Sequence, residues 1–374
     1  MIIVINTHSL IKDDDAANFV AESFIHLAQQ HPKHQFIFLA ESKNNFNYIL
    51  NSNCSVTEIG KAPVNNLLWK YWYNYKIPGV LKRLKANAYI SLNGIYCLRT
   101  TVPQYMLLQH VSLSDGNSIF SKKITQYYKN NASEYLCKAK KIWITSEEVK
   151  HKLATMYSID EVNIGLLPLA INQNFIPLSW EDQIAIKSNT TNGKDYFLVK
   201  SDSLLVENFI LLLKAFSKFK KWQKSSLQLI IISIQNKNIH QLKQQLTSYK
   251  YKEDVQLLTD ITAQDYAKLL AASYAFIYPY FQSNLPIAIL QALQCKIPVV
   301  TQNINNINLT FADSVEYVNA NKIDDIAAKM ILLYKDENSR NNLIEKGKII
   351  AANYHWNNTC STLWEAISIS PDAI

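Results

Sequence analysis

Polar side chains follow several short apolar stretches of this chain, at positions where a ligand could reach them. Asn93, Gln109, His110 and Ser146 come at the ends of such stretches, and Lys200 ends another. If the stretches are parallel strands, their carboxyl ends form the edge at which α/β folds bind ligands. His110 could offer a proton or a positive charge to a leaving phosphate, or be a hydrogen-bonded wall residue. The other polar residues could contact a ligand, anchor loops or cap helices.

The segment YPYFQSNLPIAILQALQCKIPVV, residues 278–300, resembles a ligand-binding connection. It reads as a strand end, a polar loop, an apolar helix and a second strand. A loop that leads into a helix N-terminus is a good place to hold an anion. Yet the segment contains no Asp, no Glu and no Gly. It is therefore either a site that uses uncharged residues or the frame of one that has lost its chemistry.

Glycine is scarce throughout the chain. There are 7 glycines in 374 residues, whereas an average usage of about 7% would give roughly 26. No two of them form a GxG motif, and none lies between Lys194 and Lys346. A glycine-rich phosphate loop needs a close backbone approach or a positive φ, so the sequence excludes such a loop.

Charge and cysteine usage narrow the function classes. The net charge is +8, but the 38 basic residues form no run of five or six. We therefore expect no nucleic acid partner, and an anionic small molecule or a membrane surface is the better candidate. The 5 cysteines form no CxxC or Cys/His cluster, so we expect no metal site and no disulfide framework. With no signal peptide and no apolar stretch near 18 residues, we expect a cytoplasmic protein.

The elements that must position these residues alternate between strand and helix. Stretches such as QFIFLAE, AYISLN and KIWITS read as buried strands, and amphipathic stretches lie between them. This alternation predicts an α/β fold of two doubly wound, Rossmann-like domains facing across a cleft. The expected boundaries are an N-terminal domain over 1–175, an interdomain linker over 176–195, a C-terminal domain over 196–355, and a C-terminal helix over 356–374 that crosses back to the N-terminal domain.

Several segments carry a resemblance to a known family. HPKHQFIFLAE and RTTVPQYMLLQH in the first half follow its framework, as do KDYFLVKSDSLLVENFILLLKAFSKFKK and YAFIYPYFQSNLPIAILQALQCKIPVVTQN in the second. In order and spacing these segments resemble the retaining nucleotide-sugar glycosyltransferases of family 4, the glycosyl transferases group 1. The resemblance covers nearly the whole chain and implies the two-domain GT-B fold. It also implies that the nucleotide-sugar is a substrate and that no cofactor or metal is required.

The residues that carry the chemistry of this family are altered here. Two family glutamates correspond to Ser283 and Gln291, and a glycine of the loop between them corresponds to Asn284. In the phosphate grip, Ser201 takes the place of a glycine. Lys200 could supply the lost positive charge, or it could be a solvated lysine at a strand end.

Further family positions also differ. The usual basic pair of the phosphate grip becomes Val206 and Glu207, and a Pro-Glu pair becomes Asn308-Leu309. A His-Asp pair becomes Gln109-His110, which leaves His110 as the one candidate catalytic residue. The first domain handles the acceptor in this family, so the resemblance places Asn93, Gln109 and Ser146 on the acceptor side.

These replacements have a physical cost. In the family, backbone N–H groups and basic side chains hold the diphosphate, and the glutamates orient sugar and ribose hydroxyls. A charge-assisted hydrogen bond contributes about 1.5–3 kcal/mol. Losing three or four could forfeit roughly 5–8 kcal/mol, or about four decades of affinity.

Two functions follow from this conflict. The first is a hexosyltransferase-type enzyme that moves a sugar from a nucleotide-sugar to a glycan or lipid-linked acceptor in cell-surface polysaccharide synthesis. The second is a catalytically inactive homologue that binds a glycan or supports a partner glycosyltransferase. The retained framework segments favour the enzyme, and the altered site residues favour the inactive homologue.

One stretch of the first half suggests a further partner. Residues 59–114 contain no acidic residue, and VNNLLWKYWYNYKIPGVLKRLKAN predicts an aromatic, basic, amphipathic helix interrupted at Pro78. Residues 61–85 could therefore make a peripheral contact with the inner face of a membrane. The alternative is that the aromatic residues pack as core.

Overall fold

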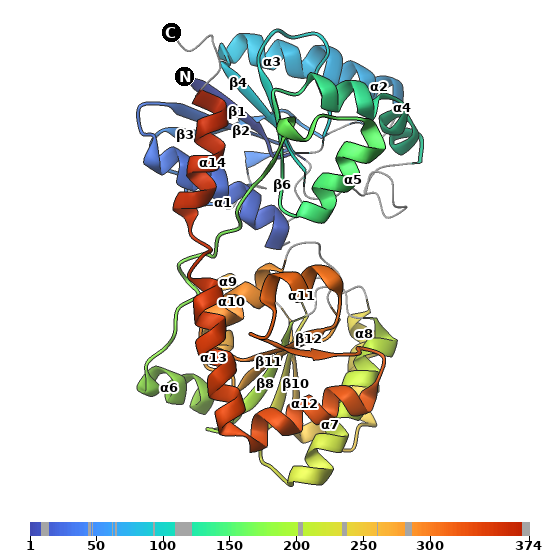
Figure 1. The fold of residues 1–374 in the computed structure, drawn as a ribbon, viewed down its shortest axis with the longest axis vertical. Coiled ribbons are helices and arrows are strands. Elements are labelled where there is room, and N and C mark those ends of the chain that lie inside the picture. The colour runs from blue at the N-terminus through green and yellow to red at the C-terminus, as the bar shows by residue number, and fades with distance from the viewer. Residues whose placement is uncertain are drawn as a thin grey trace. The chain divides into compact units, whose positions relative to one another are not determined.

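The computed structural model describes residues 1–8, 15–43, 46, 48–61, 63, 66–92, 94–108, 122–200, 205–233, 238–259, 261–280 and 286–368. The chain divides into two compact units (Figure 1). The first domain comprises Met1–Ala170 with His355–Ile374, and the second comprises Ile171–Tyr354.

The first domain is built on a parallel sheet with the strand order β3-β2-β1-β4-β5-β6-β7. Its strands are β1 (Ile2–Asn6), β2 (Gln35–Ala40), β3 (Cys54–Glu58), β4 (Ala88–Ser91), β5 (Gln104–Leu107), β6 (Lys141–Ile144) and β7 (Ile164–Leu166). Its helical elements are α1 (Asp15–Gln30), α2 (Asn66–Tyr71), η2 (Trp72–Lys76), α3 (Ile77–Leu84), α4 (Lys122–Lys138), α5 (Glu147–Tyr157), η3 (Glu161–Asn163) and α14 (Trp356–Ser368). The chain runs outward from β1 in both directions, and right-handed crossovers therefore place helices on both faces of the sheet.

The second domain repeats this plan with the strand order β10-β9-β8-β11-β12-β13. Its strands are β8 (Tyr196–Lys200), β9 (Gln228–Ile232), β10 (Val255–Leu258), β11 (Ala275–Tyr278), β12 (Val299–Gln302) and β13 (Glu316–Val318). Its helical elements are α6 (Trp180–Thr191), α7 (Val206–Gln223), α8 (Ile239–Thr247), η4 (Lys252–Asp254), α9 (Ala263–Ala271), α10 (Ile287–Gln294), α11 (Asn305–Phe311), α12 (Ile323–Lys335) and α13 (Glu337–Ala351). The predicted α/β class with two doubly wound domains is confirmed.

The aromatic helix of the first domain is continuous through Pro78. The segment η2 is a π-helical turn, in which the N–H of Ile77 bonds the carbonyl of Trp72. Proline has no N–H for the usual bond and crowds the carbonyl four residues earlier, so a wider turn accommodates it. The expected interruption at Pro78 was wrong, because the π turn carries the chain from α2 into α3.

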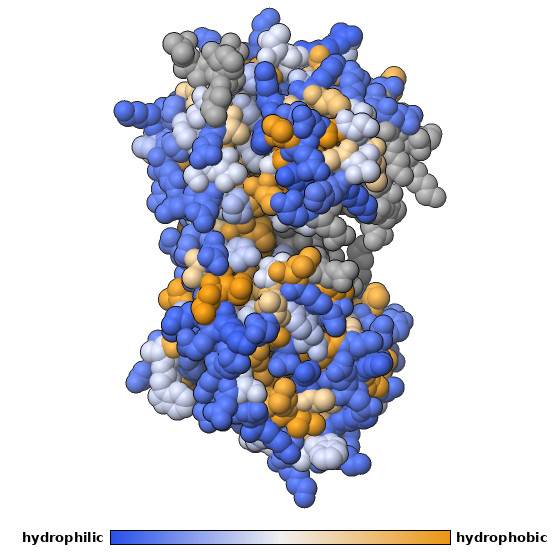
Figure 2. Space-filling view, in the orientation of Figure 1, coloured by the Kyte–Doolittle hydropathy of each residue, from blue (hydrophilic) through white to orange (hydrophobic). Residues whose placement is uncertain are grey.

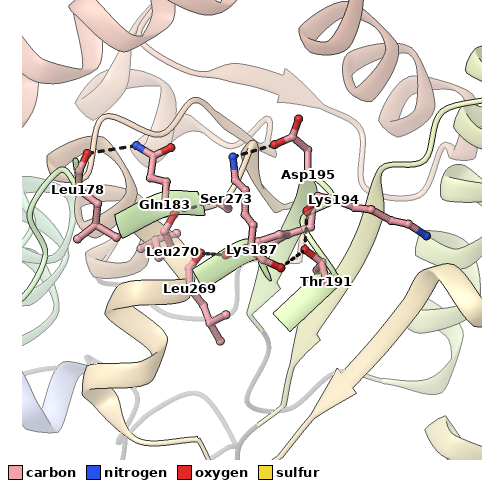
Figure 3. A network of polar contacts seen from close by, with 10 residues as sticks. Leu178, Gln183, Lys187, Thr191, Lys194, Asp195, Leu269, Leu270 and Ser273 are labelled. Atoms are coloured by element: carbon pink, nitrogen blue, oxygen red, sulfur yellow. Dashed lines mark hydrogen bonds and ion pairs between the residues drawn. The ribbon is translucent and has the colours of Figure 1, made fainter. Parts of the chain in front are cut away.

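The segment expected to link the domains contains helix α6, which is fixed within the second domain (Figure 3). Lys187 forms an ion pair with Asp195 over 2.8 Å. The side chain of Gln183 donates to the carbonyl of Leu178 over 3.2 Å, and the hydroxyl of Thr191 donates to the carbonyl of Lys187 over 2.9 Å (Figure 3). The ion pair joins α6 to the residue that precedes β8, a central strand of the sheet, and the other two bonds lie within α6 and its N-terminal flank.

The surface of each domain is largely hydrophilic on the face shown in Figure 2, with smaller apolar groups among the polar ones. In the described part of the chain, no helix has the length and apolarity needed to cross a membrane.

The C-terminal helix α14 packs against α1 in the first domain through stacked rings. His26 stacks on Trp356 with ring centroids 4.3 Å apart, and His31 stacks on Trp364 at 3.7 Å. Burial lowers the pKa of both histidines from its usual value. Both rings are therefore held as neutral imidazoles at neutral pH.

We expect this contact to weaken in acid. Because the folded pKa lies below the unfolded value of about 6.5, unfolded histidine takes up protons first, and stability falls as pH drops below that value. His31→Phe keeps the stacked ring and removes the titration. Thermal melts at pH 7.5 and 5.5 should show a smaller loss of Tm for His31→Phe than for the unaltered chain. Equal losses would contradict this account.

Candidate functional site

The structure describes three of the nine predicted site residues: Lys200, Gln291 and Ser146. The other six lie outside the described residues; they are Asn93, Gln109, His110, Ser201, Ser283 and Asn284.

Ser146 occupies the N-cap position of helix α5 but does not cap it. Its backbone is extended, with φ −145° and ψ 134°, and its side chain makes no capping hydrogen bond. Thr262 shows the contrast, because its side chain accepts a bond from the N–H of Asp265 over 3.1 Å at the start of α9. The hydroxyl of Ser146 is therefore not used by its helix, and a ligand contact stays a prediction.

Lys200 is the last residue of β8, and its side chain is buried. Only 3% of the residue is exposed, and its ammonium lies 4.9 Å from the centre of the Tyr266 ring on α9. The alternative of a solvated strand-end lysine was wrong. A buried ammonium needs compensating contacts, and an aromatic face supplies about 2 kcal/mol when water is excluded. This cation lies at the carboxyl end of the central strand, where an anionic ligand would need one.

Gln291 is held in the second domain by a helix that is buried along its length. All residues of α10 from Ile287 to Leu293 are buried. Helix α13 lies close against it, because a Cβ added at Gly347 would come within 2.7 Å of the Leu293 side chain. Gln291 itself is 7% exposed, and its Oε1 has no hydrogen-bond partner within the part of the chain that the structure describes.

An unsatisfied oxygen in a buried helix is costly. Leaving a buried acceptor without a partner costs about 1–3 kcal/mol, and native structures contain few such groups. The position of Gln291 is set by packing that would equally suit an apolar side chain. The amide is therefore suited to receive a hydroxyl or N–H donor from a ligand.

The register of the sheet brings further polar groups to the same edge. Lys200 pairs with Ile232, so Ser233 follows directly at the end of the neighbouring strand β9. The buried hydroxyl of Ser233 and that of Tyr280, just beyond β11, have no hydrogen-bond partner among the described residues. Sequence reasoning missed both. An apolar strand followed by one serine was the available signal, and it was too common to single Ser233 out.

Two other family positions are now placed in the second domain. Glu207 is exposed in the first turn of α7, where a carboxylate suits the helix N-terminus. The amide of Asn308 on α11 donates to the side-chain oxygen of Asn303 over 2.6 Å, and Leu309 beside it is 87% exposed. Glu207, Asn308 and Leu309 therefore offer a ligand no positive charge. Among the described family positions of this domain, Lys200 is the one that carries a positive charge.

The first domain has a second polar cluster, at the carboxyl ends of β1 and β3. The ring of His8 contacts the edge of Trp72 with centroids 5.7 Å apart, and its Nε2 lies 3.2 Å from the carbonyl of Gly60. The ammonium of Lys76 donates to the carbonyl of Ile59 over 2.7 Å and lies 3.8 Å above the Trp72 ring.

Burial is the main reason why the pKa of His8 lies below its usual value; Glu41 acts against this and Lys76 with it. A neutral imidazole beside a fixed cation can exchange a proton with a ligand hydroxyl. Sequence reasoning missed this cluster because its members are spread from residue 8 to residue 76. No group of three or more metal-ligating side chains occurs among the described residues of either domain.

Comparison with known proteins finds a family match in the second domain. Residues 181–349 match the family model described as glycosyl transferases group 1, so the predicted resemblance is confirmed there. The chain is 22% identical over 242 residues to the O-antigen chain mannosyltransferase B of Escherichia coli. That alignment covers 64% of this chain and 63% of the relative.

Solved structures support the fold over the whole chain. A glycosyltransferase from Rickettsia africae is 16% identical with a TM-score of 0.76, and 99% of each chain is covered. Anabaena Alr3699/HepE, solved in complex with UDP and glucose, is 13% identical with a TM-score of 0.76 over 98% of this chain and 99% of that one. The predicted GT-B fold is therefore confirmed.

The unsatisfied oxygen of Gln291 leads to a stability prediction. Gln291→Met keeps the shape and removes the buried acceptor, so the free energy of unfolding should rise by about 1–3 kcal/mol. Gln294→Met, in the same helix but partly exposed, should change it by less than about 0.5 kcal/mol. Urea denaturation of the two variants measures the difference. A loss of stability in Gln291→Met would show that the oxygen is satisfied in the folded protein.

Proposed function

We propose that this chain transfers a sugar from a nucleotide-sugar to a glycan or lipid-linked acceptor in cell-surface polysaccharide synthesis, with retention of configuration. The group 1 match over residues 181–349 and the GT-B fold support the class of reaction. The curated relative, a mannosyltransferase of the O-antigen chain, supports a hexosyl donor and a polysaccharide product.

The observation that carries the proposal is the buried ammonium of Lys200. In this proposal it neutralises the diphosphate of the donor, in place of the basic pair that α7 lacks. The carboxyl end of the central strand is where doubly wound folds hold such groups. The proposal assigns the acceptance of a donor hydroxyl to the amide of Gln291, and further contacts to the donor to Ser201, Ser283 and Asn284. The complex of Anabaena Alr3699/HepE with UDP and glucose supports a nucleotide-sugar as the ligand class.

On the acceptor side, the proposal assigns His110 the transfer of a proton and Asn93, Gln109 and Ser146 the contacts to the acceptor. It requires no metal and no cofactor, because cationic and neutral donors of the protein would meet the leaving diphosphate.

A second function is supported by a specific observation. Gln291 carries no charge, and the first turn of α7 presents Val206 and Glu207 instead of cations. A domain whose family positions offer Lys200 as a cation and otherwise uncharged or acidic side chains could retain glycan binding without turnover. In that case the chain would be an inactive homologue that holds a glycan or supports a partner glycosyltransferase.

Calorimetry with UDP-, GDP- and ADP-sugars separates the two functions. Micromolar binding of one of them is expected for the enzyme, and Lys200→Met should weaken it about 10-fold to 100-fold, the equivalent of one charge-assisted hydrogen bond. The control is Lys220→Met, since Lys220 is another buried lysine of the same domain, in the last turn of α7, where it pairs with Asp254 over 3.0 Å. No detectable binding of any of these nucleotide-sugars would favour the inactive homologue. An equal loss of affinity in both variants would show that Lys200 does not contact the ligand.

The proposal includes a peripheral contact of residues 61–85 with the inner face of a membrane. Trp69, Trp72 and Tyr73 are buried, as the core alternative predicted. Other apolar residues of the same helix face solvent: Leu67 is 76%, Leu68 55%, Tyr71 58% and Tyr75 48% exposed. Lys70, Lys82 and Arg83 lie beside them, which is the pattern of a helix that lies in an interface.

Flotation with vesicles tests this contact. The unaltered chain should bind vesicles that contain anionic lipid and lose that binding at high salt, because the basic residues contribute about 1 kcal/mol each. A double change of Leu67→Ser and Tyr71→Ser should reduce the bound fraction several-fold, whereas Ile349→Ser, an exposed apolar residue of the second domain, should not. Equal binding of all three would rule out residues 61–85 as the contact.

A further inference from the structure

A pocket of about 370 Å³ opens on the first domain, between the end of the edge strand β3 and the helix formed by η2 and α3. This volume lies at the small end of ligand pockets, which range from about 300 to 1,000 Å³, and suits one or two sugar rings. Its lining includes Glu58, Ile59, Tyr75, Lys76, Gly79 and Arg83.

Two cations and one carboxylate line this pocket without neutralising one another. Among the described residues, no ion pair joins Glu58 to Lys76 or to Arg83. The N–H of Lys43 donates to the Glu58 carboxylate over 2.6 Å, which fixes it and leaves other lone pairs for a ligand. Lys76 is fixed by the carbonyl of Ile59 over 2.7 Å. Arg83 makes no hydrogen bond or ion pair within the described ranges.

The wall of the pocket is one face of a helix. Lys76, Gly79 and Arg83 follow at the three- and four-residue spacing that aligns side chains on one face. The ring of Tyr75 is held in place by Arg99, whose guanidinium lies 4.3 Å from its centre, and by a stack with Tyr71 at 5.4 Å. The charged groups therefore project from fixed positions.

Gly79 is the residue that keeps this space open. It lies in a helix with ordinary backbone angles, and a Cβ added there would have no heavy atom within 4 Å. A glycine in a helix costs about 1 kcal/mol relative to alanine. The chain uses only 7 glycines, and neither packing nor φ requires this one. What its absent side chain provides is room in the pocket.

We propose that this pocket binds a sugar ring that carries a carboxylate or phosphate group. The anionic group meets Arg83 and Lys76, and ring hydroxyls donate to the Glu58 carboxylate. Inorganic phosphate would use the cations but bring no sugar ring to the pocket and no ring hydroxyls to Glu58, and a neutral sugar would leave Arg83 without a partner. Only a ligand with both features satisfies the whole lining.

The role of this pocket as a subsite for an acidic sugar of the acceptor deepens the proposed function and rests on it. Binding itself requires neither donor nor turnover. The pocket can therefore fail its test while nucleotide-sugar binding stands, and the reverse also holds.

Saturation-transfer NMR and calorimetry with glucuronic acid, glucose 6-phosphate, glucose and inorganic phosphate test the proposal on the full chain. The two acidic sugars should bind, and glucose and phosphate should bind at least about 10-fold more weakly. Arg83→Gln should weaken the acidic sugars about 10-fold or more, whereas Lys82→Gln, the exposed cation beside it that does not line the pocket, should change their affinity less than about twofold.

Gly79→Leu provides the sharper variant, since its Cβ would meet no heavy atom within 4 Å, its side chain adds bulk at the pocket wall, and leucine favours the helix. It should abolish binding of the acidic sugars while Tm is unchanged or higher, and Gly79→Ala should raise Tm with a smaller loss of binding. Unchanged binding in Gly79→Leu, equal binding of glucose or phosphate, or no binding of any probe would each overturn the proposal.

Discussion

Parallel pairing of the strands is the constraint on which the rest of this structure depends. Both sheets are parallel throughout their described strands, so every strand delivers its carboxyl end to the same edge. The inner strands β1, β4, β8 and β9 are buried at nearly every position and are mainly apolar, which leaves that edge as the place for polar groups. Lys200 ends β8 and Ser233 follows β9 at that edge in the second domain, and His8 follows β1 in the first.

The two domains use that edge differently. In the second domain the polar groups are buried, and two oxygens on different elements, of Ser233 and Gln291, have no described partner. Each buried oxygen without a hydrogen-bond partner costs about 1–3 kcal/mol. A folded protein tolerates such an oxygen where a bound ligand donates the missing hydrogen bond. In the first domain the charged groups are fixed by backbone carbonyls and aromatic rings, yet they remain accessible. Under the proposed function the second domain encloses its ligand, and under the further inference the first domain meets one at its surface.

The sequence predicted the fold better than the sites, for a physical reason. Alternation of apolar stretches with amphipathic ones is a local pattern, and it predicted the buried strands within QFIFLAE, AYISLN and KIWITS, which the structure has as β2, β4 and β6. Burial is not local: Lys200 is enclosed by α9, more than sixty residues away, so the sequence could not tell a buried lysine from a solvated one. The same holds for helix 66–84, where Tyr71 and Tyr75 are exposed while Trp69 and Trp72 are buried. Helix α6 was not predicted within the expected linker, because it is only weakly amphipathic and is held by polar interactions.

The scarcity of glycine has a different weight once the backbone is known. Helices very commonly end with glycine in the left-handed region, because other residues pay about 1–2 kcal/mol there. Here α3, α5, α6 and α7 end in that region with Lys85, Ser158, Asn192 and Lys224. The chain therefore avoids glycine even where its geometry calls for it and no ligand is involved. The absence of the family's loop glycines therefore follows from the low glycine content of the whole chain. It is weaker evidence for a lost activity than the absence of the family's charged residues. In the proposed function Lys200 supplies the positive charge and Gln291 the hydrogen-bond acceptor, so the proposal depends on these two residues more than on the loop glycines.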